Sequence, residues 1–294
     1  MTILLQAVIN GLLIGGVYAL AAMGVSLMFG IMKLINFAHG EFIMLGMYIA
    51  VVFTGVGIPA GLLGIYWVVI PTMVVTAGVG ALFYVALLDR AARFGESPQI
   101  LLTIGLSIGG IGLAQVVAGS DFKLPPNPVN GASLALGDIT FQVGPGIAFL
   151  LAVAMAIWMA WMLKRTRFGK NARAVAESRE TAEMLGVNAH HVFLVTTTIS
   201  IALAGLAGAL VIPYHYTYPS VGEDFVVMAF LAVVIAGLGN VLGSVLGGLL
   251  LGCIQSLTAT YFDIDLSTAA IYVLFLAVLL LRPEGLFTAA RRTV

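Results

Sequence analysis

The sequence predicts an all-α polytopic membrane protein with about eight transmembrane spans in a single domain covering residues 1–294. Of its 294 residues, 61% are hydrophobic and 9% are charged, whereas a soluble domain has about 25% charged residues. The charges gather in short segments between apolar stretches close to the roughly 20 residues that cross a bilayer. The formal net charge is zero, so nothing indicates a nucleic-acid partner.

Eight apolar stretches are separated by polar or charged segments, with predicted external loops at 119–146 and 213–224. Pro71, inside the third stretch, predicts a kink. The stretches are Leu4–Met32, Phe42–Val56, Leu62–Leu88, Ile100–Ala118, Ile147–Leu163, Val192–Ile212, Phe225–Leu257 and Ser267–Leu281.

Basic residues are distributed unevenly between the two sides of the predicted membrane. Lys33, the Asp89–Glu96 segment, the 164–191 loop and the C-terminus can all lie on one side, which leaves Lys123 as the one basic residue on the other. Because basic loops stay in the cytoplasm, this pattern predicts an external N-terminus and a cytoplasmic C-terminus.

The stretch 225–257 is too long for one span. A continuous helix of this length would be about 50 Å long, against a hydrocarbon core of about 30 Å. The predicted orientation also requires the stretch to begin and end on the same side. Its middle, AGLGNVLGSVLGG, contains Gly239 and Asn240, and Gly and Asn can interrupt a helix. We therefore expect a broken or re-entrant segment, where transporters often place a substrate site.

Gly239, Gly243 and Gly247 recur every four residues and predict one glycine-lined helix face. Such a face permits close packing of helices. It would also suit a thin wall or hinge beside a pathway, and the two roles are compatible.

The run NFAHGE holds three candidate site residues, Asn36, His39 and Glu41. Ionisable residues in or near a span are candidates for a transport pathway. The other interpretation places them at the inner interface, capping the helix that follows, where Glu41 would favour the helix N-terminus.

The most basic part of the chain is residues 164–191, which contain six of its thirteen Lys and Arg residues. Good helix formers from Asn171 to Leu185, followed by Gly186, predict a short helix with a glycine at its C-terminal end. The loop is either a solvated segment that only sets orientation or a docking element for a cytoplasmic partner.

Several chemistries have no support in the sequence. There is no phosphate-binding loop of the G-x-x-x-x-G-K-[ST] type, no H-E-x-x-H and no nucleophile elbow. His190 and His191 lack the further ligands of a zinc site. We therefore expect no enzyme activity, no metal site and no cofactor on this chain.

Four blocks carry a resemblance to a known family. In order they are NGLLIGGVYALAAMGVSLMFGIMKLINFAHGEFIMLG, RAVAESRETAEMLGVN, AGLGNVLGSVLGGLLLG and LLLRPEGLF. Together they resemble the branched-chain amino acid permease family of bacterial ABC importers. The chain is similar to the H-type rather than the M-type subunit, chiefly through NFAHGE and its length.

The resemblance implies a multi-pass subunit of the bacterial inner membrane that carries a branched-chain or other amino acid. It implies a second related permease as a heterodimeric partner in the lipid membrane, two cytoplasmic ATPase subunits that bind ATP and Mg²⁺, and a periplasmic solute-binding protein. It also implies that the 164–191 loop couples to the ATPase, and Glu177, Ala182 and Gly186 echo an E-A-A…G pattern at a different spacing. The candidate coupling residues are Arg173, Glu177, Ala182, Leu185 and Gly186.

Two alternatives use no ATPase: an ion-coupled secondary transporter that acts alone, and a channel for a small amide-like solute such as urea. A secondary transporter should carry paired ionisable groups in its spans. Outside NFAHGE, the predicted spans here are almost free of charge, which favours the importer.

Overall fold

The computed structural model describes residues 2–57, 59, 63–125, 129, 131–136 and 139–287, and these are almost entirely helical. Eight segments within this part are long and apolar enough to cross a membrane, which confirms the prediction of an all-α polytopic membrane protein. The α-helices are α1 (Thr2–Met32), α2 (His39–Val56), α3 (Val69–Phe83), α4 (Asp89–Ala92), α5 (Glu96–Ala118), α6 (Val143–Arg165), α7 (Arg167–Glu177), α8 (Arg179–Met184), α9 (Ala189–Val211), α10 (Val221–Ala236), α11 (Val241–Tyr261) and α12 (Ile264–Leu281).

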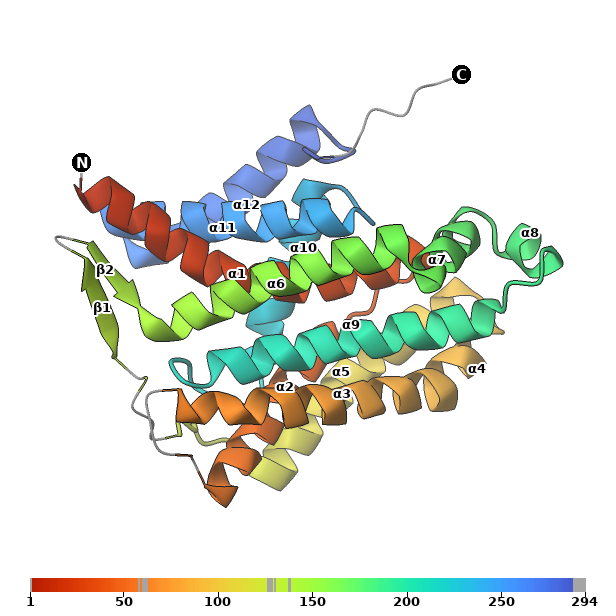
Figure 1. The fold of residues 1–294 in the computed structure, drawn as a ribbon, viewed down its shortest axis with the longest axis horizontal. Helices are drawn as coiled ribbons and strands as arrows, with labels where there is room; N and C mark the ends of the chain where they lie inside the picture. The colour runs from red at the N-terminus through yellow and green to blue at the C-terminus, as the bar shows by residue number, and fades with distance from the viewer. Residues whose placement is uncertain are drawn as a thin grey trace.

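The long helices run roughly side by side, so the molecule has two ends (Figure 1). The N-terminus and a hairpin of β1 (Ser133–Leu136) and β2 (Ile139–Gln142) lie at one end, while α4, α7 and α8 lie at the other. The hairpin is antiparallel, with Ser133 opposite Gln142. The basic loop and the charged segment after Leu88 therefore share an end, as the charge pattern predicts. Which end faces the cytoplasm stays a prediction.

The packing centre of the bundle is α1, which is rich in Gly and Ala. In its most apolar stretch, 83% of the residues are buried within the chain, compared with 72% in the corresponding stretch of α9 and 6% in that of α5. Lipid tails are as apolar as Leu, so membrane helices associate through close packing of small residues rather than through the hydrophobic effect. A Cβ placed on Gly15 of α1 would lie 2.8 Å from the Cα of Leu249 in α11, which shows how closely the two helices approach.

The third span is not a regular helix. It begins with a 3-10 turn at Gly64–Val68, continues as α3, passes through a π-helical turn at Tyr84–Leu88 and ends in α4. Pro71 lies in the first turn of α3, where a missing N–H breaks no helical hydrogen bond. The change from a 3-10 turn to an α-helix comes just before Pro71, and a kink at Pro71 itself stays a prediction.

The predicted break in the 225–257 stretch is confirmed. Helix α10 ends at Ala236, and α11 begins at Val241. Gly237 and Gly239 in the turn have φ values of 104° and 84°, a region that only glycine adopts at little cost. With 16 residues, α10 is only about 24 Å long, shorter than a bilayer core of about 30 Å.

Candidate functional site

The basic loop forms two helices rather than the predicted single helix from Asn171 to Leu185. Ser178 is extended, with φ −155° and ψ 112°, and its hydroxyl accepts a hydrogen bond from the amide of Thr181 at 3.3 Å. It therefore ends α7 and caps the N-terminus of α8. Serine at this position satisfies an amide that the helix itself leaves free. The prediction of a continuous helix is wrong because a good N-cap residue lies inside it.

The C-terminal end of α8 is fixed at Gly186, as predicted. Gly186 has φ 84°, its amide donates to the carbonyl of Glu183, and the amide of Val187 donates to the carbonyl of Ala182 at 3.0 Å. This pair of hydrogen bonds is the Schellman arrangement, which requires a left-handed residue. The chain therefore leaves α8 in a defined direction.

The short helix α8 is held against the bundle on one side and open on the other. Ala182 is 2% exposed, and the guanidinium of Arg179 lies 5.6 Å from the centroid of the Phe193 ring in α9. Met184 and Leu185, in contrast, are 86% and 79% exposed. Of the predicted coupling residues, Ala182 is therefore a packing residue, while Leu185 projects an apolar side chain outward.

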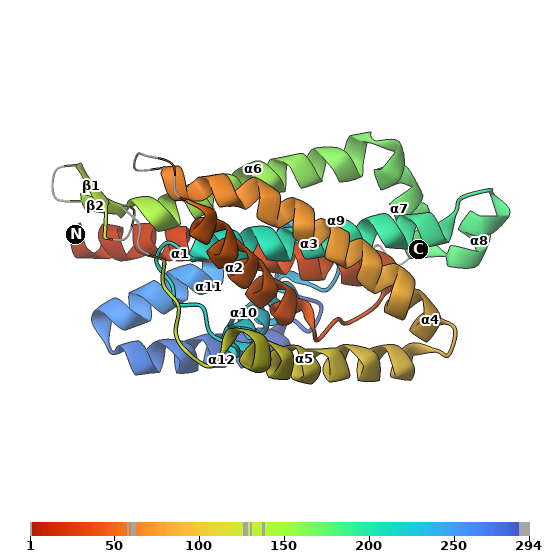
Figure 2. The same cartoon turned by 90° about the horizontal axis from the view of Figure 1, so that it is seen from below.

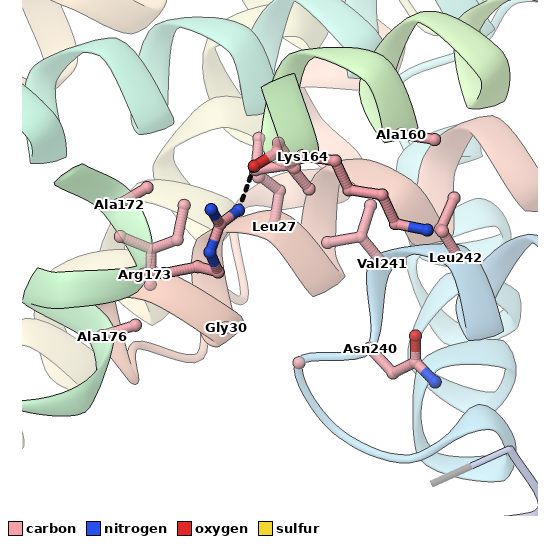
Figure 3. A pocket seen from close by; sticks show the side chains of 13 residues that line it. Leu27, Gly30, Ala160, Lys164, Ala172, Arg173, Ala176, Asn240, Val241 and Leu242 are labelled. Carbon is pink, nitrogen blue, oxygen red and sulfur yellow. Dashed lines mark hydrogen bonds between the residues drawn. The ribbon is translucent and has the colours of Figure 1, made fainter. Parts of the chain in front are cut away.

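The other two predicted coupling residues belong to α7. Glu177 is exposed at its last turn. The guanidinium of Arg173 donates to the carbonyl of Leu163 at the end of α6 (Figure 3), where a cation also meets the negative end of the helix dipole. Arg173 therefore links α7 to the end of α6.

A cavity of about 270 Å³ lies where α7 faces the end of α1 and the start of α11 (Figure 3). Its lining includes Arg173 and Lys164 from the basic loop and Gly239 and Asn240 from the glycine-rich turn. Two candidate regions that are far apart in the sequence therefore border one cavity. A Cβ on Gly30 of α1 would lie 3.0 Å from the carbonyl oxygen of Gly239, so the turn also touches the end of α1.

The predicted glycine face holds for Gly243 and Gly247, which lie four residues apart in α11, but is wrong for Gly239. Gly239 lies in the turn, Gly243 faces the side chain of its own N-cap residue Asn240, and Gly247 packs on the carbonyl of Ala232 in α10. The turn precedes α11 and interrupts the helical repeat, so Gly239 does not share the face of Gly243 and Gly247. Asn240 accepts from the amide of Gly243 at 2.9 Å and donates to the carbonyl of Phe287 at 2.9 Å.

His39 lies deep in the bundle rather than at the inner interface. A Cβ on Gly24 of α1 would lie 2.8 Å from His39 Cε1 and 2.9 Å from the carbonyl of Ser200, which is halfway along α9. His39 is fully buried, and among the described residues neither ring nitrogen has a hydrogen-bond partner. The segment between α1 and α2 therefore leads back into the bundle, so that α2 begins at a buried residue.

Neither His39 nor Glu41 makes a capping hydrogen bond to α2, although Glu41 lies in the first turn of this helix, as the capping interpretation expected. The N-cap residue of α2 is Ala38, which has no polar side chain to cap the helix. Asn36 accepts from the amide of Ala38 at 3.1 Å and is a local turn residue. Glu41 is 6% exposed, and its Oε1 accepts from the hydroxyl of Ser107 in α5 at 3.0 Å.

Helices α2 and α10 meet at their N-terminal ends. A Cβ on Gly222 would lie 2.7 Å from the carbonyl carbon of Gly40. Each helix follows a non-helical segment and carries acids in its first turn, Glu41 in α2 and Glu223 with Asp224 in α10. Non-helical backbone at membrane depth persists where protein covers it or where it lines a cavity, and such half-helix ends are typical of transporter sites.

A second cavity, of about 560 Å³, lies beside this crossing and is lined by Tyr18, Glu223, Asp224 and Gln255 among others. Tyr18 donates to Gln255 Oε1 at 2.8 Å. Burial and the neighbouring Asp224 raise the pKa of Tyr218 to about 12, so its hydroxyl stays protonated and donates to Asp224 Oδ2 at 2.6 Å.

Comparison with known proteins identifies the family. Residues 7–281 match the model of the family described as branched-chain amino acid transport system / permease component. The chain belongs to this permease family. No solved structure matches the chain significantly.

Curated relatives of this permease agree along nearly the whole chain. The high-affinity branched-chain amino acid transport system permease protein BraD of Pseudomonas aeruginosa is 30% identical, over 96% of this chain and 95% of its own. LivH of Escherichia coli K12, a permease protein of the same description, is 29% identical over 96% and 94%. A probable LivH of Methanocaldococcus jannaschii is 27% identical over 91% and 87%. These relatives are transport subunits rather than enzymes.

Three residues that the sequence reasoning missed shape the site. Ser178 is recognisable in hindsight as an N-cap, because Glu180 follows in the first turn. Ser107 and Gly222 have no comparable signal, since their roles depend on which helix lies opposite.

Proposed function

We propose that this permease is one membrane subunit of an ATP-driven importer for an amino acid, and that α7 and α8 dock on a cytoplasmic ATPase. The substrate class in this proposal is supported by the relatives, which are permease proteins of branched-chain amino acid transport systems. In the proposal a second permease completes the pathway, a binding protein delivers the solute outside, and ATP with Mg²⁺ binds on the ATPase.

The exposed pair Met184 and Leu185 at the end of a fixed helix carries the docking proposal. Large apolar side chains exposed together on a rigid element are typical of contact surfaces. The cap at Ser178 and the turn at Gly186 keep α8 in one orientation, so a movement of the partner would be transmitted rather than absorbed. The contact of Arg173 with the end of α6 extends this path into a membrane helix.

The test replaces both exposed residues, Met184→Ser with Leu185→Ser, in cells that also produce the partner subunits. We expect the variant to reach the membrane in normal amounts but to lose uptake. Co-purification of the ATPase should fall at least about tenfold, because truncating a residue at the centre of a contact costs about 2 kcal/mol or more. Phe94→Ser is the matched control, since Phe94 is 78% exposed outside the loop. Co-purification equal to that of the parent would contradict docking through α8.

The orientation is tested with single cysteines in a Cys253→Ala background, because Cys253 is the one native cysteine. An impermeant thiol reagent applied to intact cells should label Lys123→Cys and spare Gly186→Cys. The reverse pattern would place α8 outside and remove it from any cytoplasmic ATPase.

A further inference from the structure

A groove of about 670 Å³ between α2, α3 and α5 is separate from the two cavities described above. Figure 2 shows α2 lying between α3 and α5. The volume falls within the range of about 300–1,000 Å³ that is usual for small-molecule sites. Its walls are almost wholly aliphatic and aromatic, including Leu45, Val79 and Leu106, and its polar side chains are Glu41, Tyr48 and Lys123.

Glu41 lies in this groove, and only one of its two carboxylate oxygens accepts a hydrogen bond. Its Oε1 is held by Ser107 at 3.0 Å, whereas among the described residues its buried Oε2 has no hydrogen-bond partner. None of the ion pairs of the described residues includes Glu41. A buried carboxylate without a countercharge is costly, so Glu41 either holds a proton or gains a cation or a strong hydrogen-bond donor at its free oxygen.

The charged and titratable groups around Glu41 do not supply that cation. His39 lies on the same helix, but its ring faces Gly24 and Ser200. Glu223, from α10, is itself acidic and acts on Glu41 as a like charge. Lys123 lies at the other end of the groove, where its Nζ is 5.8 Å from the centroid of the Tyr48 ring, and Tyr48 is about 10 Å along α2 from Glu41, at 1.5 Å per residue.

We propose that Glu41 binds the ammonium group of the transported solute, and that the apolar walls of the groove hold its aliphatic side chain. The proposal rests on the proposed function, because it identifies where that importer contacts its solute. Ser107 positions the carboxylate, and Tyr48 offers a buried hydroxyl that has no partner among the described residues. A primary ammonium donates charge-assisted hydrogen bonds that suit the free Oε2.

Gly110 provides a direct probe of the groove. A Cβ at this position would lie 3.5 Å from Glu41 Cγ, an ordinary contact, whereas a Cβ on Gly112 of the same helix meets nothing within 4 Å. Gly110→Cys and Gly112→Cys, each in the Cys253→Ala background, are therefore a matched pair. The complete importer would be placed in nanodiscs of phosphatidylcholine and phosphatidylglycerol, which contain no primary amine that could occupy the site.

The experiment measures maleimide modification of the two cysteines with leucine, 3-methylbutan-1-amine or 4-methylpentanoate present. We expect leucine and the amine to slow modification at position 110 several-fold, the acid to have no effect, and position 112 to be unaffected. Adding Glu41→Gln should abolish the protection. Equal protection by the acid, protection that survives Glu41→Gln, or no protection by any of the three compounds would overturn the proposal.

Uptake provides the second readout. Glu41→Gln should lower leucine uptake per ATP hydrolysed by about ten- to hundredfold, the usual effect of losing a hydrogen bond to a charged group. Ser107→Ala should lower it less, because the carboxylate remains. Both variants should co-purify with the ATPase. A loss of co-purification would point to a defect in α8 docking instead, so the two proposals fail in different ways, and parent-like uptake by Glu41→Gln would overturn this one.

Discussion

Helices α5 and α11 are both rich in glycine, yet their glycines meet different surroundings. In α11, Gly248 lies against α1, where a Cβ would be 2.5 Å from the amide nitrogen of Ala19, and Gly252 packs on the backbone of Gly11 and Gly15. In α5, Gly105, Gly109 and Gly112 have nothing within 4 Å of an added Cβ. Glycine spacing therefore marks a face that another helix can approach closely, but it does not say whether one does.

The difference follows from the positions of the two helices in the bundle. Helix α11 is enclosed by α1 and α10, whereas only 6% of the apolar stretch of α5 is buried within this chain. An open glycine face on a peripheral helix is available to lipid or to a second subunit. Gly186 differs from both. An added Cβ would meet open space there, but φ is 84°, so the backbone conformation rather than a close neighbour favours glycine at this position.

The largest effect is expected for Gly252→Leu in α11. Backbone atoms of Gly11 and Gly15 occupy the space that the side chain needs, with Gly15 Cα 2.5 Å from an added Cβ, and backbone cannot move aside as a flexible side chain does. We expect destabilisation of about 3 kcal/mol or more, at the upper end for overpacking. Size-exclusion profiles and melting temperatures in detergent would measure it. A parent-like melting temperature would show that α1 and α11 are not closely packed.

Gly186→Val should have an intermediate effect, with a different cause. A β-branched residue at positive φ costs about 1–2 kcal/mol, and the exit from α8 would change direction. We expect normal membrane amounts but reduced ATPase co-purification and uptake. Gly186→Asn is the control, since Asn tolerates this conformation. If the Asn variant fails as badly as Val, the requirement at this position is not conformational.

The smallest effect on the isolated chain is expected for Gly109→Leu in α5. Because an added side chain meets no neighbour in this chain, the free energy of unfolding of the subunit alone should change by no more than about 0.5 kcal/mol. Its melting temperature should therefore stay close to that of the parent. Co-expression with a second permease sharpens the comparison, because loss of that partner on purification would identify α5 as the interface. A clear drop in stability of the subunit alone would instead mean that α5 packs against this chain.

The sequence by itself determined the membrane class, the grouping of charged segments at two ends, the break near Gly239 and the glycine end of α8. These depend on local properties. The length of an apolar stretch can be compared with the thickness of the bilayer, charged residues are excluded from lipid, and glycine is the residue that adopts positive φ at little cost. The sequence also placed Glu41 among the candidate site residues, but both a cap and a pathway fitted its position next to a span.

Only the tertiary structure decided what those residues contact. It placed His39 beside Gly24 and Ser200 inside the bundle, paired Glu41 with Ser107, set Gly40 against Gly222, and divided the basic loop at Ser178. Contacts between helices depend on which faces meet, and in lipid small residues permit many pairings of similar energy. Spacing along the chain therefore specifies which faces are able to pack, and the assembled bundle selects the pairs that do.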